Sequence, residues 1–552
     1  MSGTPRGVDG RSPTLSHHKR KRHLRQPPKF NGGTNNLIER GHVAGYTGIE
    51  EYTEPRITTM PLRRQLLLFV LFVAVAAAMR FYRLGEWSFG FDEFFTTIET
   101  KVLMGERPIP PEHLQGGALK EADSPLLRLP RMIPVSYFIH WLDYRLFGED
   151  EFGSRVLMAA IGSLSVGVIF VLALPILGQA GSLGLALLVL LWPEHVLQSQ
   201  ENRFYSQSFF FISVVLLLGG HVVVRRSTIA ALWLGPTAFL MVLCHVLGGV
   251  AWGALLGGVV LDVTFRRFIA QEKEKIPWKL LAILGGWTVL LVLHVFFYVA
   301  PLAKGWNDDV TWGCTPLYAC LAFGKAIGLP LFLLCGFGLA VGLADFRRHG
   351  GGYWACCAVV CGLAVILLPL RIVYNPWYTI LFSLPFLAVA ALFLERVYRF
   401  FADSGIPYGR GIGVFWLLAC PLVQTQSLLS YYADGGRPDL RTAFHYVRDH
   451  WQEGDRLTGF WMGAAEWYIP EQKPRIPLRP FDTATRLQQI LDDKVGGDGR
   501  LWIVVQSERG GLDRELCRWL SRNALFEIRF MKKRFDHIEN NVEVFLYMPS
   551  GR

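Results

Sequence analysis

Long apolar stretches recur along the whole chain, and they constrain its fold more than any other feature. About 11 of them have the length that a helix needs to cross a bilayer, although several are near the lower limit of roughly 17 residues. With 51% hydrophobic and 18% charged residues and a mean hydropathy of +0.29, the chain is more apolar than water-soluble domains are. We therefore predict a mainly α-helical, polytopic membrane protein. The stretches lie at about 66–79, 156–177, 182–197, 204–224, 229–244, 247–262, 280–300, 321–344, 352–370, 377–394 and 411–430.

The net charge of +11 comes largely from the N-terminal end of the chain. Residues 1–64 hold 12 basic and 5 acidic side chains, so nucleic-acid binding is not expected. We interpret residues 1–62 as a disordered basic cytoplasmic tail. The first apolar run follows Arg63-Arg64 without a small-residue cleavage site, which is typical of a retained signal-anchor helix. The nine cysteines show no spacing typical of a zinc site.

The segment 131–147 decides the predicted topology, because it could either cross the membrane or lie along it. If it does not cross and Arg63-Arg64 are cytoplasmic, every basic connector faces inward, as the positive-inside rule requires. If it crosses, four basic connectors face outward. We therefore expect an interfacial helix there, within a long first outer loop at 83–152.

The same parity places on the outer side the connectors 198–203, 245–248 and 371–376, the loop 301–320 and the tail 431–552. The tail alternates strand-like runs at 501–505, 525–530 and 542–547 with helix-like runs at 438–451, 483–492 and 512–522. We predict a transmembrane catalytic domain at 63–430 followed by a small soluble α/β domain at 431–552.

Two adjacent carboxylates, Asp92 and Glu93, stand among aromatic residues just beyond the first helix. A carboxylate shielded from water at the membrane surface is suited to act as a general base. The alternative is structural, with Asp92 capping a helix at 93–104 and Glu93 favouring the positive end of its dipole.

Cations next to aromatic residues recur in the outer segments. Arg203 lies in a polar connector before an apolar helix, and a guanidinium there can hold an anionic phosphate through two hydrogen bonds. Arg371 lies near Tyr374 and Tyr378, and Lys304 lies beside a tryptophan. Snorkelling side chains and interfacial aromatic belts are the structural alternative.

With these residues in place, the chain resembles the GT-C superfamily of membrane glycosyltransferases, which use polyprenyl-phosphate sugars. The likeness is to the protein O-mannosyltransferase and aminoarabinose transferase families and spans roughly residues 60–470. The matching motifs occur in the family's order, and they are Asp92-Glu93, Ser124-Pro125-Leu126, Leu146-Phe147-Gly148, Arg155, Arg203-Phe204-Tyr205, His245 and the segment from Tyr378 to Pro385.

The resemblance implies inverting sugar transfer without a protein-sugar intermediate. Asp92 would deprotonate the acceptor, and Glu93 would orient the acceptor or bind a divalent cation. Arg203, with Arg371 or Lys304, would stabilise the leaving phosphate. The resemblance implies that Arg155 pairs with the acidic loop, and that Tyr205, His245, Tyr374 and Tyr378 support the site. The expected partners are a polyprenyl-phosphate sugar and a glycan, lipid or protein acceptor.

Two other classes of protein remain as alternatives. A transporter or flippase for a lipid-linked glycan would also have many helices, but its ionisable residues usually lie within them. A membrane anchor that presents residues 431–552 would not need the polar outer loops. For the enzyme we expect a bacterial inner membrane with the active face in the periplasm, the endoplasmic reticulum being the alternative.

Overall fold

The computed structural model describes most of the chain from residue 60 onward. The described residues are 60–107, 127–269, 277–303, 315–346, 350–370, 378–434, 438–459, 462–473, 475–477, 500–506, 514–530 and 542–548. The predicted tail at 1–62 lies almost entirely outside them, as do the motif at 124–126 and the predicted helix at 483–492.

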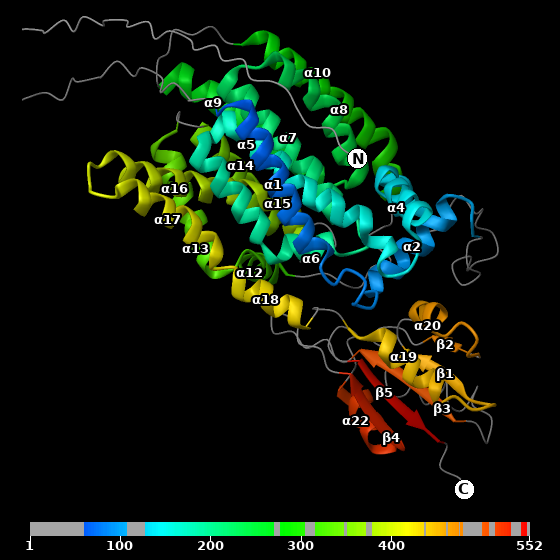
Figure 1. Ribbon diagram of the computed structural model, residues 1–552. Helices are drawn as coiled ribbons and strands as arrows, with labels where there is room; N and C mark the ends of the chain where they lie inside the picture. The colour runs from blue at the N-terminus through cyan, green and yellow to red at the C-terminus, as the bar shows by residue number, and fades with distance from the viewer. Residues whose placement is uncertain are drawn as a thin grey trace, which may run out of the picture. The chain divides into compact units, whose positions relative to one another are not determined.

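Helices form nearly all of the apolar part, and their positions follow the predicted stretches closely (Figure 1). They are α1 (Leu62–Phe81), α5 (Val156–Leu191), α6 (Pro193–Ser199), α7 (Tyr205–Arg225), α8 (Thr228–Cys244), α9 (Gly248–Thr264), α10 (Trp278–His294), α11 (Ala300–Ala303), α12 (Pro316–Ile327), α13 (Leu329–Ala344), α14 (Gly351–Leu367), α15 (Thr379–Phe382), α16 (Leu384–Asp403), α17 (Gly409–Leu422) and α18 (Thr425–Asp434).

Six helical segments of the described chain are long and apolar enough to span a membrane, or seven if the bent pair α12 and α13 is one span. The protein is therefore a multi-pass membrane protein, but the predicted total of about 11 spans is not confirmed. Helices α8 and α9 have 17 residues each, about 26 Å of helix, which is shorter than the roughly 30 Å hydrocarbon core. The predicted span at 321–344 is bent by 98° next to Gly328, whose φ is 84°.

Helix α5 is a single assigned helix that contains a reversal of the chain. Gly178 has φ 74° and ψ −177°, which is not helical. The Ser165 hydroxyl lies 3.2 Å from Nε2 of His195, although a continuous helix would separate residues 30 apart by about 45 Å. A Cβ added at Gly162 would meet the Ser199 side chain in the same way. The chain therefore folds back at Gly178, as the separate apolar stretches 156–177 and 182–197 predicted.

The connectors gather at opposite ends of the helices. At one end, Arg225 donates to the carbonyl of Pro175 at 3.0 Å, and Arg226 pairs with Asp262 at 3.3 Å. The start of α5, the end of α8 and the acidic loop meet at the other end. The connector at Arg225 and Arg226 thus lies at the opposite end of α7 from Arg203, as the parity argument expects for these two connectors. The cellular compartment that each side faces stays a prediction.

The segment predicted to lie along the membrane forms α3 (Arg128–Met132) and α4 (Pro134–Phe147). Asp143 of α4 accepts a hydrogen bond from the backbone N–H of Leu157, at the start of α5. Ser136 donates to the carbonyl of Cys244, at the end of α8, at 2.8 Å. Helix α4 thus contacts the ends of two apolar helices, while Phe138 remains half exposed.

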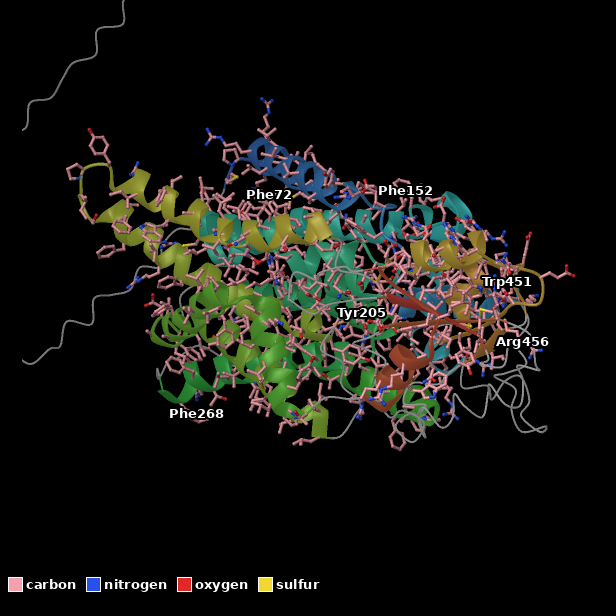
Figure 2. The ribbon with its side chains drawn as sticks, turned by 90° about the horizontal axis from the view of Figure 1, so that it is seen from below. Phe72, Phe152, Tyr205, Phe268, Trp451 and Arg456 are labelled. Carbon is pink, nitrogen blue, oxygen red and sulfur yellow. The ribbon has the colours of Figure 1, made fainter. Side chains whose placement is uncertain are left out.

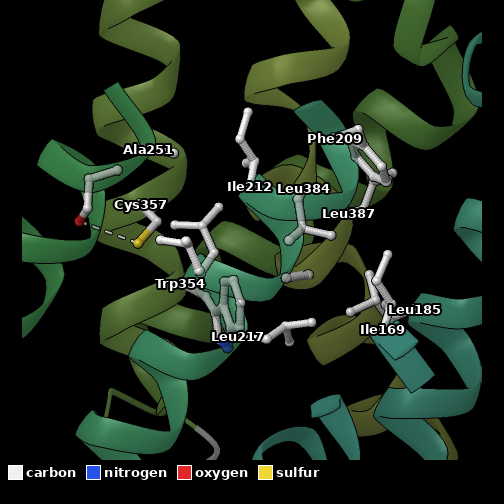
Figure 3. Packing of buried hydrophobic residues seen from close by; sticks show 14 of the residues in the cluster. Ile169, Leu185, Phe209, Ile212, Leu217, Ala251, Trp354, Cys357, Leu384 and Leu387 are labelled. Carbon is white, nitrogen blue, oxygen red and sulfur yellow. Dashed lines mark hydrogen bonds between the residues drawn. The ribbon is translucent and has the colours of Figure 1, made fainter. Parts of the chain in front are cut away.

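Large apolar side chains pack closely between the helices. The Phe72 ring of α1 lies 5.2 Å from Phe170 of α5, and Figure 2 labels Phe72 on its helix. Trp354 is fully buried among aliphatic side chains that include Leu217 and Leu384 (Figure 3). Such interdigitation supplies the packing that holds membrane helices together.

A five-stranded sheet follows the apolar part. Its strands are β1 (Arg456–Gly459), β2 (Arg475–Pro477), β3 (Leu501–Gln506), β4 (Phe526–Phe530) and β5 (Val542–Tyr547), in the order β2-β1-β3-β5-β4. β1 pairs in parallel with β2 and β3, whereas β5 runs antiparallel to β3 and β4. The associated helices are α19 (Leu440–Asp449), α20 (Met462–Tyr468) and α22 (Arg514–Asn523). All three predicted strands are present, and the domain boundary at 430 stays a prediction.

Candidate functional site

The acidic pair lies in the first turn of α2 (Phe91–Leu103), which begins two residues earlier than predicted. Gly90 precedes the helix, and its backbone N–H donates to Oε2 of Glu93 at 2.6 Å. The cap contact is therefore made by Glu93. Asp92 does not take the capping role that the structural alternative assigned to it.

Glu93 and Arg155 form a buried ion pair. Their side chains are 2% and 0% exposed, and Nε and Nη2 of Arg155 donate to the two carboxylate oxygens at 2.9 Å each. The guanidinium also donates to the carbonyls of Leu84, Trp87 and Ser88. Arg155 thereby holds the turn before α2 against the start of α5. The resemblance implied that Arg155 pairs with the acidic loop, and its partner here is Glu93 of that loop.

The connector before α7 completes the surroundings of Glu93. The backbone N–H of Asn202 donates to Oε1 of Glu93 at 2.7 Å, and the Asn202 side chain donates to Thr97 at 3.1 Å. A buried carboxylate such as that of Glu93 needs several hydrogen-bonding or charged partners to remain ionised without water.

Asp92 has a different environment, although it is the next residue. It is half-buried, and its carboxylate accepts no hydrogen bond from any described residue. Nη1 of Arg203 donates to the backbone carbonyl of Asp92 at 3.0 Å and to the hydroxyl of Thr96 at 2.6 Å. Burial lowers the pKa of Arg203, but the Asp92 charge and other neighbours outweigh it and raise the pKa, so the guanidinium stays charged. Its buried Nε has no hydrogen-bond partner within the described part of the chain.

Three aromatic residues from separate elements pack together next to Arg203. The Tyr378 ring lies 5.4 Å from His245 and 6.3 Å from Tyr205, and Figure 2 labels Tyr205 amid the helices. The Phe204 ring lies 4.9 Å from Tyr205 and 5.1 Å from His245, and the Arg203 guanidinium lies 4.4 Å above it. The structure thus brings together predicted residues from four connectors that are far apart in sequence.

Three predicted site residues lie outside the described residues. They are Lys304, Arg371 and Tyr374. Their predicted roles at a donor phosphate stay predictions.

Glu99 is a site residue that the sequence reasoning missed. It lies two helical turns after Asp92, and its Oε2 accepts a hydrogen bond from the Tyr137 hydroxyl of α4 at 2.5 Å. Burial raises the pKa of Glu99 to about 7, although the Tyr137 hydrogen bond and the Arg203 charge pull it down in part. Polar residues spaced four and then three apart, at Asp92, Thr96 and Glu99, share one helix face and could have revealed it.

The described residues contain no candidate metal site. No group of three or more His, Cys, Asp or Glu side chains among them is placed so that it could hold a metal ion. The divalent cation that the resemblance leaves open stays a prediction.

Comparisons with known proteins address the fold. No family model and no curated protein matches the chain. Among solved structures, ArnT from Cupriavidus metallidurans bound to undecaprenyl phosphate is similar with a TM-score of 0.50 and 15% identity, over 88% of this chain and 98% of that chain. Apo ArnT from Cupriavidus metallidurans has a TM-score of 0.49 and 14% identity, over 87% of this chain and 98% of that chain. An oligosaccharyltransferase of Archaeoglobus fulgidus, in complex with zinc and sulfate, has a TM-score of 0.48 and 12% identity, over 79% of this chain and 67% of that chain.

The chain therefore shares the fold of ArnT, and the similarity extends over nearly the whole of the ArnT chain. This agrees with the GT-C fold that the resemblance predicted.

Proposed function

We propose that the protein is an integral membrane glycosyltransferase that takes a sugar from a polyprenyl-phosphate donor. The acceptor receives the sugar at the helix ends where the polar connectors meet, which we assign to the periplasmic side of a bacterial inner membrane. Support comes from the fold shared with ArnT, whose solved structure contains undecaprenyl phosphate. A lipid-linked donor also suits a site at the ends of apolar helices.

The observation that carries the proposal is the position of Arg203 beside Asp92, where its guanidinium donates to the Asp92 backbone carbonyl. A half-buried carboxylate without a described hydrogen-bond partner can accept a proton, and a charged guanidinium beside it can bind an anion. Both groups stand where α2 meets the connector before α7. General-base catalysis of group transfer from a phosphate needs these two functions side by side.

The chemistry is a single displacement. Asp92 takes the proton from the acceptor hydroxyl or amine, and the freed electron pair attacks the anomeric carbon. The bond from that carbon to the phosphate oxygen breaks, polyprenyl phosphate leaves with the electron pair, and the anomeric configuration inverts. Arg203 stabilises the charge that grows on the leaving phosphate. Arg371 and Lys304 are proposed as further phosphate ligands.

The remaining residues hold these groups in place. We assign Glu93 a positioning role, because its carboxylate is engaged by Arg155, Asn202 and Gly90. This assignment replaces the acceptor-orienting or cation-binding role that the resemblance implied. Tyr205, His245 and Tyr378 form the wall beside Arg203, and Tyr374 is proposed to extend it.

The test is transfer of radiolabel from undecaprenyl phosphate carrying hexoses or pentoses, in membranes that contain wild type, Asp92→Asn or Asp403→Asn. Asp403 is an exposed carboxylate at the end of α16 and serves as the matched control. We expect wild type and Asp403→Asn to transfer the labelled sugar, and Asp92→Asn to transfer it about 10²- to 10⁴-fold more slowly.

Equal transfer by wild type and Asp92→Asn would remove Asp92 as the base. If wild type moves no label from any donor, the glycosyltransferase proposal fails. Net movement of the intact lipid across vesicle membranes would then favour a flippase.

A further inference from the structure

The turn that carries Asp92 is held from one side by Arg155 and from another by residues of the C-terminal segment. The backbone N–H of Phe89 donates to the hydroxyl of Tyr468, at the end of α20, at 2.9 Å. The Ser88 hydroxyl donates to the carbonyl of Pro438 at 2.6 Å. These contacts join residues about 350 to 380 positions apart, three and four residues before Asp92.

The apolar side chains of the same turn belong to the C-terminal core. Phe89 is fully buried, and its ring lies 5.3 Å from Phe94 and 5.5 Å from Trp467. The Phe94 ring lies 5.7 Å from Tyr468. Both phenylalanines share one hydrophobic cluster with α19, α20 and the sheet. Because Phe94 is two residues from Asp92, it faces away from the Asp92 side of α2.

A polar rim closes the contact around Tyr468. Its hydroxyl donates to Oε1 of Glu151 at 3.0 Å, and Arg441 of α19 pairs with the same oxygen at 3.3 Å. Arg441 also donates to the carbonyl of Glu86 at 2.5 Å. Beyond the end of α2, Arg107 pairs with Glu466 of α20 at 2.6 Å. Both sides of the first outer loop are thus tied to the C-terminal segment.

We propose that the C-terminal segment sets the position of the Asp92 turn, and that Tyr468 is the positioning residue through which it acts. The apolar cluster buries one face of α2, and the Tyr468 hydroxyl accepts from the buried N–H just before the helix. The opposite face of α2, with Asp92, Thr96 and Glu99, then faces Arg203. A shift of α2 by an ångström changes the distance from Asp92 to a bound acceptor, and such shifts cost up to about 10²-fold in rate. This inference rests on the proposed function.

Tyr468→Phe tests it, because phenylalanine keeps the ring and removes the hydroxyl that accepts from Phe89. The matched control is Tyr547→Phe in β5, since that ring packs 5.5 Å from Trp519 in a tilted arrangement and its hydroxyl makes no hydrogen bond to a described residue. We expect Tyr468→Phe to lower kcat for label transfer about 10-fold or more, with little change in the donor KM. Tyr547→Phe should match wild type.

The second readout is amide hydrogen exchange over residues 84–104 in detergent-solubilised full-length protein. We expect faster exchange at 89–94 in Tyr468→Phe and wild-type exchange in Tyr547→Phe. If Tyr468→Phe does not purify as a folded protein, Ser88→Ala removes the neighbouring hydrogen bond to Pro438 and tests the hold of the C-terminal segment on the same turn. It should show the same pattern in smaller degree.

Wild-type kcat and wild-type exchange in Tyr468→Phe or Ser88→Ala would overturn the inference. A lower kcat with unchanged exchange at 89–94 would overturn it too, since positioning requires both. If wild type transfers no label, the proposed function fails and kcat has no meaning. Exchange then decides by itself whether Tyr468 holds the turn.

Discussion

Arg155 and Arg203 both contact the acidic pair, but they are satisfied in opposite ways. All three guanidinium nitrogens of Arg155 donate to the Glu93 carboxylate or to backbone carbonyls. Arg203 reaches a backbone carbonyl and one hydroxyl through Nη1, and its Nε has no described partner. The first region is a closed ion pair, whereas the second keeps hydrogen-bonding capacity in reserve.

This difference assigns different roles to two adjacent residues: Glu93 stabilises the structure, whereas Asp92 is available for proton transfer. A carboxylate whose lone pairs are occupied is a poor base, because taking up a proton would break its ion pair. A carboxylate beside a charged but incompletely bonded arginine can exchange protons while the arginine accepts an anion. We expect substitutions in the Arg155 region to change stability and substitutions in the Arg203 region to change transfer.

The largest expected effect is on stability, from Arg155→Met. It leaves the buried Glu93 charge without its partner, which costs about 3–5 kcal/mol. The unfolding temperature in detergent should fall sharply, whereas Arg203→Met should change it little. Adding Glu93→Gln to Arg155→Met should recover part of the loss, because it removes the unpaired charge. Equal destabilisation by Arg155→Met and Arg203→Met would contradict the comparison.

Arg203→Lys should impair transfer next most strongly. Lysine keeps the charge but loses the planar fork that can hold a phosphate through two hydrogen bonds. We expect kcat/KM for the polyprenyl-phosphate donor to fall about 10- to 100-fold without loss of folding. Arg410→Lys, at an exposed arginine of α17, is the control. If both variants keep wild-type kcat/KM, Arg203 does not bind the donor.

The smallest effect should be the pH dependence that comes from Glu99. The folded pKa of about 7 exceeds the ordinary value of 4.5, so between these pH values only the unfolded chain ionises. The unfolded state then binds fewer protons, and the free energy of unfolding falls as pH rises from about 4.5 to 7. The fall should be about 1 kcal/mol, because the Glu99 side chain is only half-buried and water screens its charge. Glu99→Gln should remove this part of the slope in detergent melts. An unchanged slope would show that Glu99 titrates normally.

Much of the fold could be predicted from hydropathy and strand patterns. Most apolar stretches became helices close to their predicted bounds, although the stretch predicted at 377–394 became α15 and the later-ending α16 (Leu384–Asp403). The strand expected at 542–547 is β5. The reversal at Gly178 was implied by two stretches with four residues between them, even though the backbone is helical on both sides of that glycine. Span number was harder to predict, because length alone does not tell a straight helix from one bent at Gly328.

The candidate site was partly predictable. Asp92, Glu93, Arg155 and Arg203 were recognisable as polar residues near apolar segments. The division of roles between Asp92 and Glu93 was not, because the partners of Glu93 lie 62 and 109 residues away along the chain. Glu99 was missed for a similar reason, since its Tyr137 partner lies 38 residues away along the chain, in α4.

By itself, the sequence determined that this chain enters a membrane, roughly where its apolar helices lie, and which connectors are polar. Those properties depend on local hydropathy and on residues within a few turns of each other. Only the tertiary structure decided which carboxylate is neutralised, which arginine keeps spare donors, and that Tyr468 touches the turn before Asp92. Hydrogen bonding and desolvation act over a few ångströms in space, and chain folding alone sets which distant residues come that close.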